Sequence, residues 1–227
     1  MLTARLEAIV GYVNGTGVVA DIGCDHGYAA QALIEQGRAQ KVIACDISEA
    51  SLDKARKLVE SQGLQDCVET RVGNGFSILE KGEADTVIIA GMGGLLIRDM
   101  LQAQKEKAAA VEKLVLAPNR SEFELRKYLN ENDFEITDEK LVKDNDKYYH
   151  VICARPGRVP TEEDEFYFHI GRKLVENKDP ILKEYLGQKI QELERILVMA
   201  EKSTNAAQLV EQAAEKKRRM QEVEECL

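Results

Sequence analysis

The sequence has no tryptophan, only three histidines and five cysteines, and it lacks any long apolar run. The cysteines are widely spaced, without a CxxC pair, so the sequence predicts neither a disulfide framework nor a zinc site. No segment approaches the roughly 20 apolar residues of a transmembrane helix, and no apolar signal core follows the first residues. We therefore expect a cytoplasmic protein without a membrane anchor or a bound metal.

Positive charge is also scarce, because 31 lysines and arginines stand against 40 aspartates and glutamates, a net charge of −9. This balance argues against a global attraction to phosphate, so contact with RNA requires a local basic patch. The candidates for such a rim are Arg5, Arg98, Arg120 and Lys127. A basic run at residues 216–219 either contacts phosphate or balances acidic residues one turn earlier. For each of these residues alone, a solvated surface charge is the simpler interpretation.

The first half of the chain alternates strand-like and helix-like segments. Runs rich in β-branched residues occupy residues 18–22, 42–46, 68–72, 87–90 and 114–117, and each precedes a turn and a helical pattern. This alternation predicts an α/β fold with a parallel sheet, preceded by an amphipathic helix. We expect Ser48 to cap a helix that ends near Gly63, and Ser121 to form a capping box with Glu124.

After residue 130 the pattern changes to two strands without an intervening helix, at 134–142 and 148–154, joined by a loop at 143–147. They predict a closing antiparallel hairpin. Pro156, Gly157 and Pro160 then interrupt the chain, which indicates a boundary between domains at 1–157 and 158–227. Beyond it, apolar residues recur at three- and four-residue steps, with a turn at 203–205. These features predict a coiled-coil-like helical hairpin, whose packing on itself or on a neighbour is open, as is the oligomeric state.

The most informative motif runs from Asp21 to Tyr28, where a strand enters a glycine-bearing turn and a helix. In a doubly wound sheet this turn contacts a nucleotide. The dinucleotide fingerprint GxGxxG fails, because Asp25 and Tyr28 stand where it requires glycine. The acidic pair Asp21 and Asp25 suits a cationic ligand better than phosphate. The alternative is a glycine turn that only reverses the chain.

Three further motifs follow the next strands. Asp46 ends the second strand, where a carboxylate accepts hydrogen bonds from ribose hydroxyls, although capping beside Ser48 is the simpler role for it alone. Asn74, between two glycines, is placed to read an adenine edge or to form an ordinary turn. The loop at residues 90–94 follows a buried strand and is expected to frame the acceptor.

Together and in this order, the four motifs resemble those of class I S-adenosylmethionine-dependent methyltransferases, which have a Rossmann-like sheet. The Ala90-Gly91-Met92-Gly93-Gly94 loop, Pro118-Asn119, residues 147–149 and the helical tail resemble bacterial tRNA (adenine-N1)-methyltransferases acting on adenosine 22 of the D-arm. This resemblance covers nearly the whole chain. Two departures are Asp25, where many methyltransferases have glycine, and Ala117, where a polar residue is expected.

The resemblance implies S-adenosyl-L-methionine as cofactor and tRNA as partner. The cofactor-binding residues that it implies are Asp21, Gly23, Cys24, His26, Gly27, Asp46, Ile47, Asn74, Gly75, Ala90, Gly91 and Met92. The catalytic candidates are Asp25, as stabiliser of the cationic product, and Asn119. No strong base is needed, because N1 of adenine has a free lone pair at neutral pH, and most of the rate comes from positioning.

Two other functions are consistent with these motifs. One is a methyltransferase acting on a small molecule or a protein, with the helical tail as a lid or dimer arm. The other is a non-catalytic nucleotide- or RNA-binding scaffold that has kept the fold. An NAD-dependent oxidoreductase is disfavoured, because the first turn lacks the dinucleotide glycines.

Overall fold

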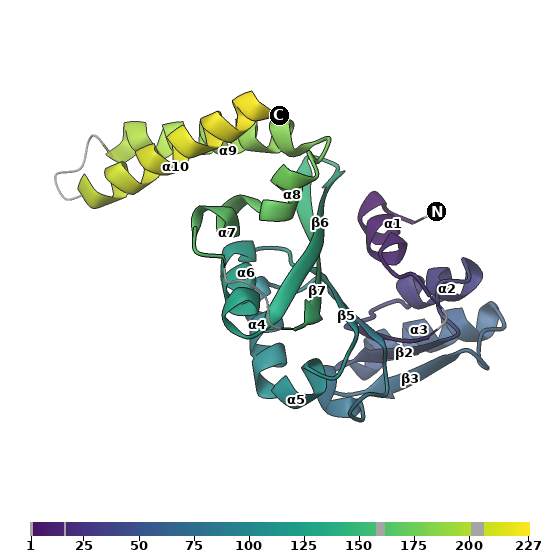
Figure 1. Cartoon of the computed structure of the whole chain (residues 1–227). Helices are drawn as coiled ribbons and strands as arrows, with labels where there is room; N and C mark the ends of the chain where they lie inside the picture. The colour runs from purple at the N-terminus through teal and green to yellow at the C-terminus, as the bar shows by residue number, and fades with distance from the viewer. Residues whose placement is uncertain (1, 16, 158–161, 201–206) are drawn as a thin grey trace.

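The chain forms a seven-stranded sheet with helices on both faces (Figure 1). This computed structural model describes residues 2–15, 17–157, 162–200 and 207–227. The strands are β1 Val18–Ile22, β2 Lys41–Asp46, β3 Val68–Val72, β4 Thr86–Ala90, β5 Lys113–Ala117, β6 Phe134–Asp144 and β7 Lys147–Pro156. Their order is β3-β2-β1-β4-β5-β7-β6; the first five are parallel, and β7 is antiparallel to β5 and β6. The predicted α/β sheet with a closing hairpin is confirmed.

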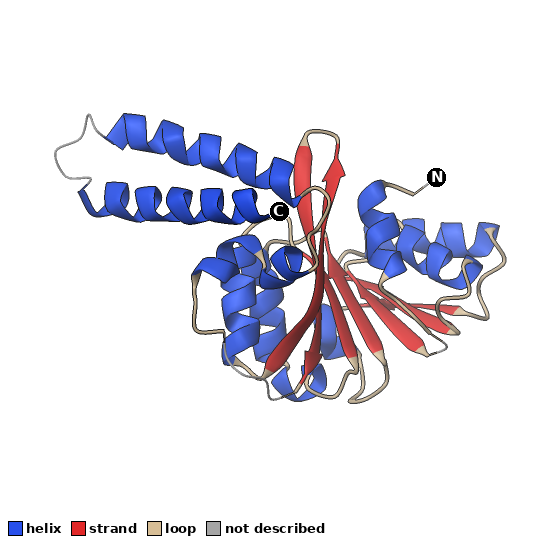
Figure 2. Cartoon of the chain, turned by 45° about the horizontal axis from the view of Figure 1, so that its top comes forward, coloured by secondary structure: helices blue, strands red, loops and turns tan. Residues whose placement is uncertain are grey.

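Two layers of helices bury the two faces of the sheet, as Figure 2 shows. The first layer contains α1 Ala4–Gly11, α2 Tyr28–Glu35 and α3 Glu49–Ser61. The second contains η1 Gly75–Ile78, α4 Gly94–Ala103, α5 Lys105–Ala108 and α6 Glu122–Glu131. Successive residues of β1 point to opposite layers, since Val19 packs in the first core and Ala20 in the second. Both faces are therefore apolar, as expected for parallel strands.

The hairpin differs from its prediction at the turn. The expected five-residue loop at 143–147 is wrong, because the strands continue to Asp144 and from Lys147, with a two-residue turn between them. Asn145 adopts φ 55°, a left-handed conformation that asparagine tolerates and that tight hairpin turns require. Since Leu116 of β5 pairs with Ile152 of β7, the turn end of the hairpin projects beyond the carboxyl end of β5.

The two predicted helix caps have different outcomes. The Ser48 side chain accepts a hydrogen bond from the Ser51 backbone N–H at 3.3 Å, which confirms the cap of α3. The capping box at Ser121 is wrong, because Ser121 has φ 62° and its side chain caps nothing. An N-cap serine needs extended backbone, whereas here the preceding carbonyl of Arg120 turns to accept the Gly94 N–H at 2.8 Å.

The C-terminal region is helical, as expected, and short helices precede its long hairpin. Two short helices, α7 Phe166–Ile170 and α8 Arg172–Glu176, flank Gly171, whose φ of 87° ends the first one. The long helices α9 Leu182–Ala200 and α10 Ala207–Cys226 run antiparallel (Figure 2). Four residues of the expected apolar stripe of α9 are buried, Leu182, Leu186, Ile190 and Ala200, whereas Leu193 and Leu197 are half-buried. Pro160 and the turn at 203–205 lie outside the described residues, and the domain boundary stays a prediction.

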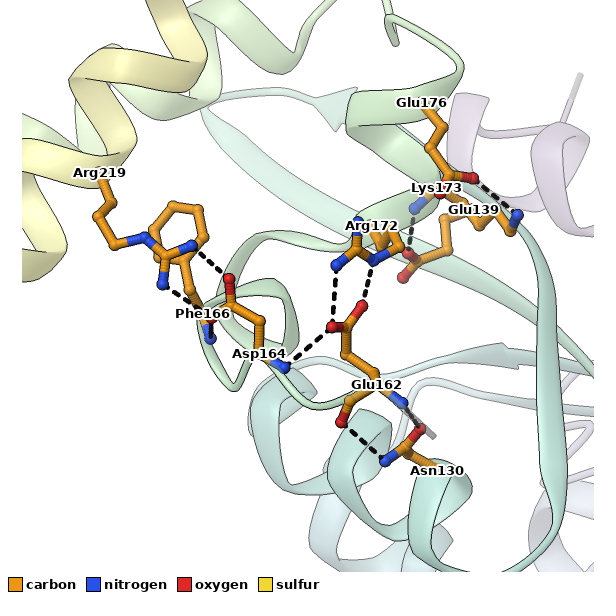
Figure 3. A network of polar contacts seen from close by, with 9 residues as sticks. All are labelled: Asn130, Glu139, Glu162, Asp164, Phe166, Arg172, Lys173, Glu176 and Arg219. Atoms are coloured by element: carbon orange, nitrogen blue, oxygen red, sulfur yellow. Dashed lines mark hydrogen bonds and ion pairs between the residues drawn. The ribbon is translucent and has the colours of Figure 1, made fainter. Parts of the chain in front are cut away.

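Polar contacts join this helical region to the sheet and to α6. Arg126 of α6 is 1% exposed; its Nε donates to Glu139 Oε1 of β6 at 2.6 Å, and its Nη1 donates to the Phe168 carbonyl of α7 at 3.0 Å. Figure 3 shows a second group nearby, in which Glu162 contacts Asn130 and Arg172. The orientation of the helical region is therefore fixed by contacts with α6 and β6.

The basic run at residues 216–219 is occupied by contacts within the protein. Lys217 pairs with Glu194 at 2.8 Å, Arg218 with Glu215 at 2.6 Å, and Arg219 Nη1 donates to Asp164 at 2.7 Å. These contacts favour the interpretation in which the run balances acidic residues. Within the described ranges, no helix is both long and apolar enough to cross a membrane, and no group of three or more His, Cys, Asp or Glu residues is arranged to hold a metal ion.

Candidate active site

The candidate residues from the sequence lie at the carboxyl ends of strands or in the turns that follow them, along one edge of the sheet. Because β1 to β5 are parallel, the turns that follow them are neighbours in space. The turn after β1 joins that of β2 directly: the backbone N–H groups of Gly23 and Cys24 donate to the Cys45 carbonyl at 2.8 and 2.9 Å. The motifs separated in the sequence therefore form one site.

Gly23 brings the first turn against the loop that follows β4. Its φ of 78° is unfavourable for other residues, and a Cβ there would lie 2.3 Å from Cε of Met92. The Met92 methyl group thus occupies the space that a side chain at position 23 would need. This contact places the predicted Gly23 and Met92 side by side.

Asp21 is a buried carboxylate with an unsatisfied oxygen. The residue is 4% exposed, and its Oδ2 has no hydrogen-bond partner among the residues that the structure describes. Burial, and secondarily the negative charge of Asp46, raises the pKa of Asp21 from 3.8 to about 7. A buried acceptor without a donor costs free energy, and a cationic or hydrogen-bond-donating ligand would recover it.

A cavity of about 120 Å³ lies beside Asp21. Its walls come from the β1 turn, from Ala90 at the end of β4, and from Leu6 and Ile9 of α1. At its rim the Asp25 carboxylate lies 2.7 Å from His26 Nδ1, from which it accepts a hydrogen bond when that nitrogen carries the proton, and 4.0 Å from Lys54 Nζ. The Asp25 charge is thus shared with two neighbouring side chains.

The site continues as an exposed surface beyond this cavity. Asp46 Oδ1 accepts the Ser48 N–H at 2.8 Å, and its Oδ2 accepts the Asp25 N–H at 3.3 Å. The next residue, Ile47, is 72% exposed, and Asn74 is also exposed after β3. A carboxylate beside an apolar platform suits a ribose with an attached flat base.

Asn119 joins the loops after β4 and β5. Its backbone N–H donates to the Met92 carbonyl at 2.7 Å, and its side-chain Nδ2 donates to the Gly91 carbonyl at 2.5 Å. No donor in the described part of the chain reaches Asn119 Oδ1. The same loops touch at Gly94, where a Cβ would lie 2.2 Å from the Ser121 carbonyl oxygen. These contacts fix the amide of Asn119 with its oxygen available.

The structure does not bring the two catalytic candidates into one cavity. Asp25 borders the 120 Å³ cavity, whereas Asn119 borders a larger one of about 570 Å³ together with Arg5 and Arg120. The other two residues of the predicted basic rim border neither cavity: Lys127 pairs with Glu165 at 2.6 Å, and Arg98 with Asp99 at 2.7 Å.

The charge pattern of the sequence indicated Arg5 as a basic residue but did not indicate which groups its guanidinium contacts. Its Nη2 donates to the Ala117 carbonyl at 2.7 Å, and its guanidinium lies 4.5 Å from the ring centroid of Tyr149. Tyr149 was noticed only as part of the resemblance at residues 147–149. The signal that could have found it is the aromatic pair at the hairpin turn, next to a lysine.

The comparison with protein families shows which family the chain resembles. The model of the TrmK family, described as tRNA (adenine(22)-N(1))-methyltransferase, matches residues 19–225. The chain belongs to the TrmK family. This match includes both the sheet edge described above and the helical region.

Relatives of known sequence or structure agree with the TrmK assignment. The tRNA (adenine(22)-N(1))-methyltransferase of Bacillus subtilis (strain 168) is 29% identical over 230 residues, covering 100% of this chain and 97% of that protein. Streptococcus pneumoniae Sp1610 in complex with S-adenosyl-L-methionine superposes with a TM-score of 0.87 at 28% identity, covering 98% of this chain and 99% of that one. M. capricolum TrmK with S-adenosyl-homocysteine gives a TM-score of 0.81 at 26% identity, with 99% and 97% covered.

Proposed function

We propose that this protein transfers a methyl group from S-adenosyl-L-methionine to N1 of adenosine 22 of tRNA, producing 1-methyladenosine. Membership of the TrmK family over residues 19–225 is the observation that carries this proposal. The candidate active site is consistent with this family, since the residues at the sheet edge suit a cationic nucleoside. Because tRNA is the substrate, we place the reaction in the cytoplasm.

The residues present fit the cofactor. The unpartnered, buried Oδ2 of Asp21 suits a ligand that carries an ammonium and a sulfonium group. Asp46 retains lone pairs for ribose hydroxyls, and the exposed Ile47 and Asn74 suit the face and edge of adenine. We assign cofactor binding to Asp21, Gly23, Cys24, His26, Gly27, Asp46, Ile47, Asn74, Gly75, Ala90, Gly91 and Met92. When bound, S-adenosyl-L-methionine supplies an activated methyl group.

Asn119 is the residue to which we assign orientation of the acceptor adenine. With Nδ2 committed to the Gly91 carbonyl, Oδ1 accepts a hydrogen bond from the N6 amino group, which adjoins N1 on the same edge. Guanine has a carbonyl at that position and would repel Oδ1. The interaction therefore both selects adenine and directs its N1 lone pair, so that the protein contributes positioning rather than a base.

Asp25 is assigned an electrostatic role. Methylation at N1 leaves the adenine ring with a positive charge, which the Asp25 carboxylate, at the rim of the neighbouring cavity, stabilises through its electric field and not by contact. Asp25 is held there by the contact with His26. N1 lies on the Watson–Crick edge, so the base must leave its stack at a cost of about a few kcal/mol, which contacts with the rest of the tRNA offset.

The test is methyl transfer from labelled S-adenosyl-L-methionine to an unmodified tRNA transcript, followed by nucleoside analysis by mass spectrometry. We expect 1-methyladenosine with the wild type, none with a transcript carrying guanosine at position 22, and a large loss with Asp21→Asn. Arg218→Gln, in an exposed ion pair far along the chain, is the matched control and keeps full activity. Methyl transfer to the guanosine 22 transcript contradicts the proposal, as does the absence of transfer to either transcript.

A further inference from the structure

The larger cavity beside Asn119 is a cleft of about 570 Å³ between the hairpin turn, α1 and the first turns of α9. The strand register explains its place, because hairpin residues beyond the Leu116–Ile152 pair project past the carboxyl end of β5. Asn119 borders this cleft and also bonds to Gly91. The cleft therefore opens directly from the position proposed for the acceptor base.

The charge of the cleft is opposite to that of the protein. The chain carries a net charge of −9, whereas four cationic and only two anionic side chains border the cleft. These are Arg5, Arg120, Lys147, Lys189, Glu122 and Asp146. A local excess of positive charge on an acidic protein attracts an anionic ligand at this place, and not over the surface as a whole.

Two of these cations are free to bind such a ligand. Arg120 and Lys147 are exposed, and neither forms an ion pair with a carboxylate in the described part of the chain. The basic run at 216–219 differs in this respect, since three of its four residues pair with carboxylates of the protein. Phosphate binding is therefore more favourable at the cleft than at the C-terminal run.

The walls of the cleft also carry aromatic rings. Tyr149 lies under the Arg5 guanidinium, and the rings of Tyr148 and Tyr185 are 5.4 Å apart. Tyrosine faces next to unpaired cations are typical of surfaces that bind unstacked nucleotides and their phosphates. A target base that leaves its stack exposes such a stretch of strand.

We propose that the cleft binds the backbone phosphates of the tRNA strand on either side of the target adenosine, with Arg120 and Lys147 contacting the phosphates. The proposal rests on the function proposed above and adds where the RNA strand lies. It couples the helical region to catalysis, because α9 supplies one wall of the cleft. Bringing a phosphate to Arg120 places the adjoining base next to Asn119.

The test measures the dissociation constant of unmodified tRNA at several salt concentrations, for the wild type and for Lys147→Gln and Arg120→Gln. Each lost phosphate contact lowers the slope of log Kd against log salt by about 1. Lys147→Arg keeps the charge and is expected to keep the slope. Arg218→Gln removes a paired arginine of the C-terminal run and is expected to leave the slope unchanged.

Two controls check that Lys147→Gln is folded. Its melting temperature and its affinity for S-adenosyl-L-methionine are both expected to equal those of the wild type. Unchanged slopes in both glutamine variants overturn the proposal, as does an equal drop in Arg218→Gln. If both glutamine variants lower the slope as expected but the wild type makes no 1-methyladenosine, only the proposed function is contradicted. Normal 1-methyladenosine formation with unchanged slopes contradicts only the cleft.

Discussion

The side chain of Asn119 donates to the Gly91 carbonyl at 2.5 Å, which joins the loops after β5 and β4. Because this bond fixes Nδ2, it also fixes which atom faces the acceptor. Asn119 is exposed. The amide thus acts as an oriented acceptor, and its removal should affect the reaction more than the fold.

We expect Asn119→Ala to lower kcat by about 10²-fold, since loss of acceptor alignment carries a penalty of this size. The affinity for S-adenosyl-L-methionine should stay within about twofold, because the Asn119 N–H still donates to the Met92 carbonyl in the variant, and Asp21 and Asp46 do not contact Asn119. Single-turnover methyl transfer and calorimetric cofactor titration measure the two quantities. A variant that loses cofactor affinity and keeps kcat contradicts the assigned role.

Asp21 gives a prediction for the pH dependence of stability. Its pKa of about 7 in the folded protein exceeds the value of 3.8 for the unfolded chain, so the folded state retains a proton that the unfolded state has released. Raising the pH from about 4 to about 7 therefore lowers the free energy of unfolding, by up to about 4 kcal/mol. Chemical denaturation of the ligand-free protein at several pH values measures this decrease.

The matched variant for this prediction is Asp21→Asn, which has nearly the same shape and no ionisation. We expect its free energy of unfolding to be flatter over the same pH range. In the wild type, affinity for S-adenosyl-L-methionine should rise as the pH increases through about 7, since the carboxylate is the form that binds a cation. Identical pH profiles for the two proteins would show that Asp21 does not titrate in this range.

The Arg126–Glu139 ion pair supports the junction between the sheet and the helical region. Both residues are almost completely buried, and Arg126 Nη2 also donates to His150 Nδ1 at 2.8 Å. Burial lowers the pKa of His150 well below its usual value, so the ring stays neutral and accepts this bond. We expect Arg126→Met to destabilise the protein by about 3–5 kcal/mol, because it leaves the Glu139 carboxylate buried without its partner.

Urea denaturation of Arg126→Met, Glu139→Gln and the double variant tests this expectation. The double variant should be less destabilised than the sum of the single variants, because it leaves no unpaired charge. The exposed Arg155–Glu135 pair serves as the comparison, and its loss should change the free energy of unfolding by at most about 1 kcal/mol. Equal effects at the two pairs would contradict the role of burial.

The fold was predictable where local patterns and long-range packing agree. The ends of three strands, at Ile22, Asp46 and Val72, were predicted to the residue, because β-branched runs end at turns that contain glycine or a polar side chain. The prediction that Ser121 caps a helix was wrong, since the conformation of this residue is imposed by the contact of the Arg120 carbonyl with Gly94. Such a contact between distant loops leaves no local signal.

The candidate site was predictable only in part. Asp21 and Asp46 occupy positions that a parallel sheet always brings together. The cleft with Lys147 was not predictable, because it requires the hairpin to extend beyond β5 and α9 to fold back against it. Neither the length of a hairpin past its neighbour nor the docking of a distant helix is encoded in a short motif.

Gly94 provides a test of the contact between the two loops of the acceptor side. A Cβ at this position would lie 2.2 Å from the Ser121 carbonyl oxygen. The backbone fixes the place of the Cβ, and the oxygen is itself a backbone atom, so neither can rotate away. The φ of Gly94 is not positive, so the effect of Gly94→Ala is steric and the loops must separate. We expect kcat to fall by about 10²-fold and stability to fall by about 1–3 kcal/mol.

The control for an added Cβ as such is Gly187→Ala in the interior of α9. Its Cβ would be 3.6 Å from the nearest side-chain atom, of Glu224, which is an ordinary contact. Replacing glycine by alanine inside a helix stabilises it by up to about 1 kcal/mol, so this variant should melt at a higher temperature with unchanged kcat. Full activity in Gly94→Ala would mean that the loops tolerate separation, and that the Asn119–Gly91 bond is not needed to hold the acceptor adenine.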